Sequence, residues 1–158
     1  MDLQSIIIGA IITIACILPF ILLRYKRVRI EKQLRAGLQA IATQNHKTIQ
    51  TDSVYVDFAI GIDTRNEFVF FYKKNAHIEI RHAICLKDID TCKIKDISSD
   101  QTKTNPETTS GLFLCLISKN KNVPEFALEF FNYETSYQLH VDKKPIEKWE
   151  SLISKYVG

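Results

Sequence analysis

A run of 21 residues without a charged side chain, residues 3–23, most constrains how this chain can be arranged. It reads LQSIIIGAIITIACILPFILL. As an α-helix rising about 1.5 Å per residue, the run would be roughly 31 Å long, which matches the hydrocarbon thickness of a bilayer. Its isoleucines and leucines favour transfer into lipid, and Pro19 lies near an end, where few helical hydrogen bonds are lost. The run therefore predicts one transmembrane helix, in an anchor segment 1–23.

The residues that flank this run predict its orientation. Four basic residues follow it closely: Arg24, Lys26, Arg27 and Arg29. Only Asp2 is charged before it. Because basic flanks stay on the cytoplasmic side, we expect the N-terminus outside and the rest of the chain in the cytoplasm. A cleaved signal peptide would need basic residues ahead of its apolar core, and none is present. The sequence thus predicts a single-pass protein of a plasma membrane or a bacterial inner membrane, with membrane lipid around the anchor.

The basic charge of the chain is concentrated beside the apolar run. The net charge is +3, and residues 24–47 carry seven basic residues against one acidic residue. Residues 48–158 are nearly neutral, with 14 basic and 16 acidic residues. A domain that binds nucleic acid usually has a basic face of its own, so nucleic acid is not an expected partner. The basic segment can attract anionic lipid, at about 1 kcal/mol per residue near the surface.

The segment 24–50 predicts a basic, amphipathic juxtamembrane helix. Ile30, Leu34, Leu38 and Ile41 recur at spacings of four, four and three residues, as on one face of a helix. No glycine or proline separates this pattern from the apolar run, so we expect one continuous helix. Three surfaces remain open as partners of the apolar stripe: the folded domain, a second copy of the chain in a homodimer, and the membrane surface.

Residues 51–158 are long enough for one cytoplasmic domain, and their pattern is mainly that of β-strands. Apolar and polar residues alternate most clearly at 54–62. Further strands are predicted at 67–73, 78–86, 89–97, 112–118, 126–130 and 137–141. The stretch 98–111 contains no apolar residue and predicts a long loop.

A helix is predicted after the last strand. Pro145 suits a first helical position, and Ile146, Trp149, Leu152 and Ile153 share one face. The expected fold class is α+β, mainly β: a seven-stranded antiparallel sandwich or barrel capped by a C-terminal helix and preceded by the N-terminal helix.

This order of elements resembles the pleckstrin homology (PH) fold, in which a C-terminal helix closes one end of two packed antiparallel sheets. Residues 136–141 and 144–153 resemble its last strand and its helix, with Trp149 as the buried tryptophan that defines the fold. The resemblance covers about residues 53–157. Family members that bind phosphoinositides have several basic residues around the first hairpin, whereas 61–67 has only Arg65 and two acids. The chain is instead similar to bacterial PH-like modules that serve as interaction platforms.

The histidines and cysteines of the domain do not predict a metal site or a disulfide framework. His77, His82, Cys85 and Cys92 are near one another in sequence, but their spacing matches no common zinc pattern. His77 and His82 are separated by an odd number of residues, which places them on opposite faces of a strand. With Cys115, the domain has three cysteines, an odd number that indicates reduced thiols. We expect no cofactor.

Catalytic motifs are also not recognised. The chain has five glycines, which form neither a phosphate-binding loop nor a nucleophile elbow. His140, Asp142 and Glu147 are residue types that occur in catalytic sets. The alternation places His140 on the solvent face, however, so we expect these residues to lie on the surface. We therefore expect a non-catalytic interaction module that binds a protein or peptide at the membrane, through a strand edge or the 98–111 loop. The alternative is a sensor of anionic lipid or of a small ligand at the membrane surface.

Overall fold

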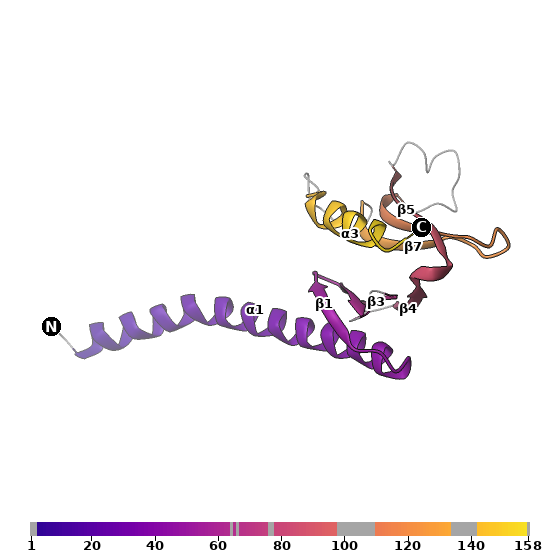
Figure 1. Cartoon of the computed structure of the whole chain (residues 1–158). Coiled ribbons are helices and arrows are strands. Elements are labelled where there is room, and N and C mark those ends of the chain that lie inside the picture. The colour runs from indigo at the N-terminus through magenta and orange to yellow at the C-terminus, as the bar shows by residue number, and fades with distance from the viewer. Residues whose placement is uncertain are drawn as a thin grey trace.

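The computed structural model describes residues 3–63, 65, 67–75, 78–97, 110–133 and 142–157, with the side chains of residues 3–6 and 9 left out (Figure 1). A long helix comes first, strands follow, and a short helix ends the chain. In order, the elements are α1 (Leu3–Gln44), β1 (Ile49–Val54), β2 (Phe58–Asp63), β3 (Phe68–Lys74), β4 (Glu79–Cys85), the 3₁₀ helix η1 (Leu86–Asp88), β5 (Ile89–Ile97), β6 (Gly111–Ser118), β7 (Phe126–Asn132) and α3 (Lys144–Ser154).

The strands form two antiparallel sheets. The first sheet has the order β1-β2-β3-β4, and the second has the order β5-β6-β7. The short helix η1 leads the chain from the first sheet to the second. For the described residues, the expected α+β class, with seven antiparallel strands and a C-terminal helix, is confirmed.

The predicted position of the first strand is wrong. Residues 54–62 are not one strand but the end of β1, a turn and most of β2. The turn is closed by the backbone N–H of Tyr55, which donates to the carbonyl oxygen of Phe58 over 2.8 Å. Val56 lies at its tip and is 85% exposed. The hairpin around 61–67 therefore joins β2 to β3, and most of β1 was not predicted.

Two other predicted segments lie largely outside the described residues. The expected strand at 137–141 is not described at all, and the expected loop is described only at residues 110 and 111. The expected closed barrel is not formed by the described strands, because no β-ladder joins the two sheets. Side chains, rather than backbone hydrogen bonds, hold the sheets together.

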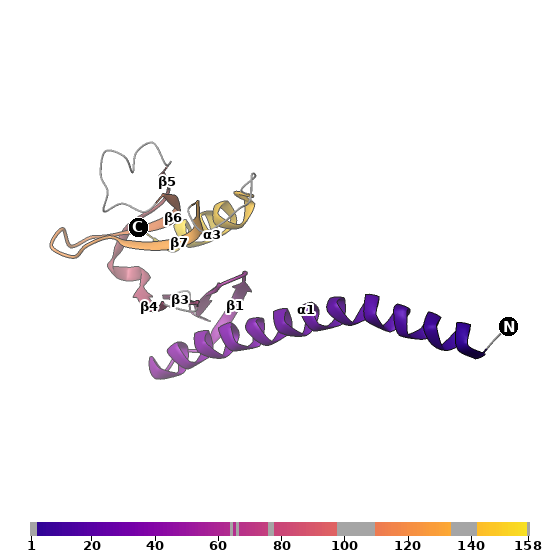
Figure 2. The same ribbon diagram turned by 180° about the vertical axis from the view of Figure 1, so that it is seen from behind.

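The main core lies between the two sheets and α3. Alternate residues of β2 and β6 belong to this core. Helix α3 lies against the second sheet (Figures 1 and 2). Trp149 is fully buried there, as expected for the tryptophan of the last helix. The largest fully buried contributors include Ile60, Ile62, Phe71, Leu112, Leu114, Leu116 and Trp149.

A second core forms between the C-terminal part of α1 and the opposite face of the first sheet. Leu34, Leu38 and Ile41 of α1 are buried with Phe70 and Tyr72 of β3. The first sheet is thus covered on both faces, which explains why β2 and β3 are buried along almost their whole length. We expected the apolar stripe to contact the domain, a second copy of the chain or the membrane. Its residues Leu34, Leu38 and Ile41 pack on the domain.

The N-terminal half of α1 extends away from the two sheets (Figures 1 and 2). The helix is continuous from Leu3 to Gln44 and includes Pro19. Among the residues whose side chains the structure describes, no helix is both long and apolar enough to cross a membrane. The transmembrane part of the expected fold class is therefore not confirmed.

Gly37 allows α1 to approach β3 closely. A Cβ atom at this position would lie 2.2 Å from Cε1 of Tyr72. The tyrosine ring has little room to move, because its hydroxyl donates a 3.0 Å hydrogen bond to Glu79 and Arg81 lies 5.7 Å from the ring centroid. Any side chain at position 37 must therefore push the helix and the sheet apart.

The substitution Gly37→Ala tests this contact. Alanine normally favours a helix over glycine by about 1 kcal/mol, but overpacking a core costs about 1–3 kcal/mol. We expect the free energy of unfolding to fall by about 1 kcal/mol, measured by urea unfolding of the full chain in mild detergent. Gln33→Ala, at an exposed position of the same helix, is the control. In a Tyr72→Ala background Gly37→Ala should no longer destabilise; a stabilising effect in the parent chain would contradict the close contact.

Candidate binding groove and the ion pairs around it

A groove of about 490 Å³ lies where the chain passes from the first sheet to the second. It is bounded by the start of β3, the end of β4, η1 and the turn between β6 and β7. Its apolar lining residues are Phe68, Ala83, Ile84, Ile89, Val123 and Phe126, and its charged ones are Lys87, Asp88 and Lys119. The groove therefore combines an apolar floor with a charged rim.

The edge of β4 forms one wall of this groove. The backbone N–H of Leu86 donates to the carbonyl oxygen of Glu67 over 2.7 Å, which continues the ladder between β3 and β4. In an antiparallel pair alternate residues bond to the neighbouring strand, so Ile84 bonds inward to β3. Ala83 and Cys85 then direct their backbone groups away from the sheet. Among the described strands, none pairs with this edge of β4.

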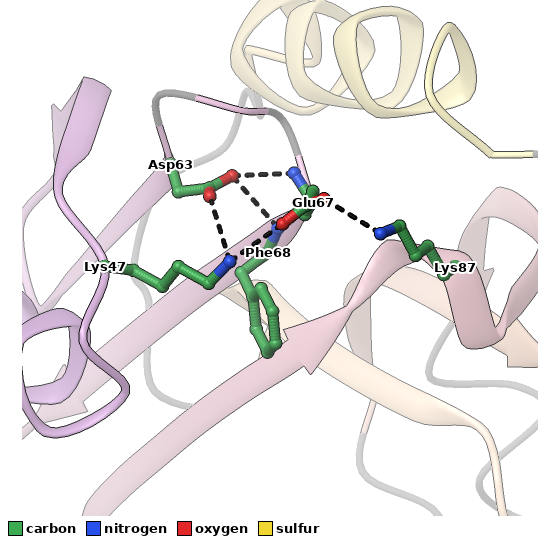
Figure 3. A network of polar contacts seen from close by, with 5 residues as sticks. All are labelled: Lys47, Asp63, Glu67, Phe68 and Lys87. Carbon is green, nitrogen blue, oxygen red and sulfur yellow. Dashed lines mark hydrogen bonds and ion pairs between the residues drawn. The ribbon is translucent and has the colours of Figure 1, made fainter.

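A network of ion pairs surrounds Phe68, one of the apolar residues that line the groove (Figure 3). The two carboxylate oxygens of Glu67 lie 2.8 Å from the ammonium groups of Lys47 and Lys87. The Asp63 carboxylate accepts hydrogen bonds from the backbone N–H groups of Glu67, at 2.7 Å, and Phe68, at 3.1 Å. Hydrogen bonds from Lys47 and Lys87 lower the pKa of Glu67 from 4.5 to about 2.

The same network positions Phe68. Lys47 places its ammonium group 4.8 Å from the centroid of the Phe68 ring, within range of a cation–π contact. Asp63 is fully buried, and its second oxygen lies 3.9 Å from Lys47. The network joins the α1–β1 connection, the β2–β3 turn and η1, because Lys47 pairs with Asp63 and Glu67 while Lys87 pairs with Glu67.

The low pKa of Glu67 predicts a pH-dependent contribution to stability. A carboxylate whose pKa falls on folding stabilises the fold above pH 4.5, and the contribution is lost as the pH falls from 4.5 toward 2. We expect Glu67→Gln to be less stable than the parent chain at pH 7, and the difference to shrink below pH 4.5. Urea unfolding between pH 7 and pH 2 measures it. Glu147→Gln, an exposed change on α3, is the control, and a constant difference across this range would contradict the prediction.

A second set of ion pairs links the two sheets directly. Lys73 of β3 is only 5% exposed. Its ammonium group lies 2.9 Å from the Asp57 carboxylate and 2.7 Å from that of Glu129 in β7. Burial alone would lower the pKa of Lys73, but its hydrogen bonds to Glu129 and Asp57 outweigh that effect and raise the pKa. Lys73 therefore joins the β1–β2 turn, the first sheet and the second sheet.

Removing the charge of Lys73 should destabilise the fold. In Lys73→Met the two carboxylates would face each other without a cation, which we expect to cost about 2 kcal/mol of unfolding free energy. Lys95→Met removes an exposed lysine that pairs with Glu125 at 2.8 Å, and it should cost about 0–1 kcal/mol. Urea unfolding of both full-chain variants gives the comparison. Equal losses of unfolding free energy in the two variants would contradict the prediction that the buried ion pairs of Lys73 stabilise the fold more than an exposed pair.

The candidate metal ligands that the structure describes, His82, Cys85 and Cys92, do not come together. His82 packs between the rings of Phe71 and Phe126, and burial lowers its pKa. His77 and His140 lie outside the described residues. No group of three potential metal ligands occurs within the described part of the chain.

The cysteines of the domain are free thiols in different surroundings. Cys85 is half-buried at the groove, whereas Cys92 and Cys115 are buried. Burial raises the pKa of Cys92 to about 12, which leaves it protonated and unreactive near neutral pH. The remaining predicted residues, Arg24, Lys26, Arg27 and Arg29, are all exposed on α1.

Sequence reasoning missed the groove and both sets of ion pairs. The groove is built from segments that are far apart in the sequence, so no local pattern marks it. One signal was available: Lys73 continues an otherwise apolar strand, where a lysine needs a buried partner.

Comparison of the chain with models of protein families, with curated proteins and with solved structures finds no match. The fold and the groove together define a domain of two sheets carried on a long N-terminal helix. Its function is inferred from the residues of this chain.

Proposed function

We propose that this protein is a non-catalytic interaction module anchored in a membrane by the N-terminal half of α1. The exposure of that half is the observation that carries the proposal. Its large apolar side chains from residue 7 to residue 23 are between 50% and 74% exposed. They are Ile7, Ile8, Ile11, Ile12, Ile14, Ile17, Leu18, Phe20, Ile21, Leu22 and Leu23.

Such a surface needs an apolar environment. Fully burying an isoleucine or leucine stabilises by about 1.5–3 kcal/mol, so covering these half-exposed side chains amounts to roughly 10 kcal/mol. They point to all sides of the helix, whereas a single partner surface would cover one stripe. A lipid environment covers every side at once, and the uncharged run of 21 residues has the length for it.

The basic residues after the run support a cytoplasmic position of the domain. Arg24, Lys26, Arg27 and Arg29 are exposed on α1 immediately beyond the apolar surface. There they would lie at the headgroups and keep the following chain on the cytoplasmic side. The same side chains would attract anionic lipid, which makes such lipid a second class of ligand.

The arrangement of the domain supports binding without catalysis. The carboxylates of Glu67 and Glu129 are bonded to lysines, and the Cys92 thiol is buried. The division into sheets of four and three strands, followed by a helix with a buried Trp149, supports the proposed PH-like character of the domain. Such a domain, held at the bilayer by a continuous helix, would offer its free surfaces to a protein partner.

Charges placed in the apolar half of α1 should release the protein from membranes. Arginine in the middle of a membrane helix costs about 2.5–3.5 kcal/mol, so the pair Ile14→Arg and Leu18→Arg costs about 5–7 kcal/mol. We expect the parent full chain to stay in the membrane fraction after alkaline carbonate washing and the double variant to be extracted.

Ile78→Arg with Val123→Arg is the matched control, because these residues are 53% and 40% exposed on the domain. This control variant should remain in the membrane fraction. Complete extraction of the parent chain by carbonate would overturn the anchoring proposal.

A further inference from the structure

We propose that the domain rests on the bilayer that anchors it, with Ile30 of α1 and Val56 of the β1–β2 turn lying in the headgroup layer. The inference rests on the proposed function for the presence of the bilayer. It goes beyond that function by assigning the face of the domain that lipid covers, and it specifies the covering surface as anionic phospholipid.

The β1–β2 turn lies at the end of the first sheet that faces the N-terminal half of α1. Figures 1 and 2 show β1 running from the end of α1 back toward that half. Arg35 of α1 holds Asp52 of β1 through a 2.9 Å ion pair. Val56 is four residues farther along, which places it up to about 13 Å nearer the membrane than Asp52. Since about nine helical residues rise by 13 Å, the turn lies between the levels of Lys26 and Arg35.

This turn presents a valine from fixed neighbours. Val56 is 85% exposed, although loops of two residues between paired strands usually carry glycine, asparagine or aspartate. The Tyr55 ring stacks on that of Phe58, with the ring centroids 4.7 Å apart. On the other side, the Asp57 carboxylate lies 2.9 Å from the ammonium group of Lys73. The turn is therefore held on both sides while its apolar side chain faces outward.

Ile30 continues the apolar stripe of α1 beyond the domain. The next three residues of the stripe are buried, but Ile30 is 45% exposed. One helical turn separates Ile30 from Leu34, and two residues separate Val56 from Val54, which packs against the same core as Leu34. Each step covers about 6 Å. Both exposed side chains thus extend the second core toward the bilayer by similar distances.

The headgroup layer lies within reach of both side chains. Ile30 is seven residues, or about 10 Å, beyond Leu23, where the uncharged run ends. The headgroups add about 5–7 Å to each side of the hydrocarbon, and membrane helices tilt by about 20° on average. Helical side chains also lean toward the N-terminus of their helix, here toward the membrane. A tilt of α1 toward its domain therefore brings Ile30 and the turn to the headgroups.

The charges around this face favour an anionic bilayer. Residues 24–35 carry six basic residues and one acidic residue, Glu31. Of the six, only Arg35 forms ion pairs with described residues, namely with Glu31 and Asp52. The other five are spread over more than two turns of the helix, so they surround it. The acid of the β1–β2 turn, Asp57, is already paired. The unpaired cations attract anionic lipid to the side of the domain where Ile30 and Val56 are exposed.

Tryptophan substitutions test the proposal in the full chain, reconstituted in vesicles of phosphatidylcholine and phosphatidylglycerol. The parent chain has a single tryptophan, the buried Trp149, which gives the background fluorescence. In Val56→Trp, we expect phospholipids brominated near their headgroups to quench the added fluorescence by about twofold or more. Val123→Trp is the matched control, since Val123 is 40% exposed in the β6–β7 turn, which lies away from the N-terminal half of α1 (Figures 1 and 2). Equal quenching in the two variants would overturn the proposal.

The lipid composition and a second substitution test the two sides of the contact. Vesicles of phosphatidylcholine alone should quench Val56→Trp less than half as strongly as anionic vesicles, and equal quenching would contradict an anionic surface. Adding Ile30→Glu to Val56→Trp should also reduce quenching in anionic vesicles at least twofold. Gln33→Glu adds the same charge about 100° around the helix from Leu34 and should have little effect. Unchanged quenching with Ile30→Glu would overturn the assigned face.

Flotation of the same vesicles separates this proposal from the anchoring proposal. A parent chain that fails to float with the vesicles would overturn the anchoring and, with it, the contact of the domain. If the parent chain floats while Val56→Trp is quenched no more than Val123→Trp, the anchor stands and only the contact of the domain with lipid is overturned.

Discussion

The contact between the C-terminal part of α1 and the first sheet supports the rest of the structure. Leu34 and Leu38 cover Phe70 and Tyr72, side chains that would otherwise face water on the outer side of the sheet. With this cover, β2 and β3 are buried on both faces, and the first sheet serves as the wall of two cores. The helix is therefore part of the domain as well as the segment that leads out of it.

Ion pairs of two lysines add connections between parts of the fold that the two apolar cores do not link. No ladder joins the described strands of the two sheets, so the sheets are free to separate wherever side chains do not connect them. Lys73 connects them at the end that carries the β1–β2 turn, and Lys87 with Glu67 connects η1 to the first sheet at the opposite end. The Lys73 ion pairs thus link the two sheets directly at one end, and at the other end the Lys87–Glu67 pair holds η1 beside the groove.

Much of the fold was predictable from periodicity, and the exceptions have physical reasons. β4 and β5 alternate apolar and polar residues, β3 and β6 are nearly continuous apolar runs, and α3 has a single apolar stripe around Trp149, so local patterns mark these elements. Most of β1 was missed because its residues Gln50 to Ser53 are polar, and the turn after it was missed because Tyr55 and Val56 continue the apolar alternation. The groove depends on the meeting of β4 with the β6–β7 turn, which only the three-dimensional arrangement provides.

The continuity of α1 sets the direction in which the domain faces. An α-helix turns by about 100° and rises by about 1.5 Å for each residue. Between Arg24 and Leu34 the helix has no glycine or proline that would act as a joint. One residue inserted there would therefore rotate the whole domain around the helix axis by about a quarter of a turn while hardly changing its height. In a bilayer, the number of residues in this segment would therefore set the rotational orientation of the domain about the helix axis, and with it the face that the domain presents to neighbouring proteins.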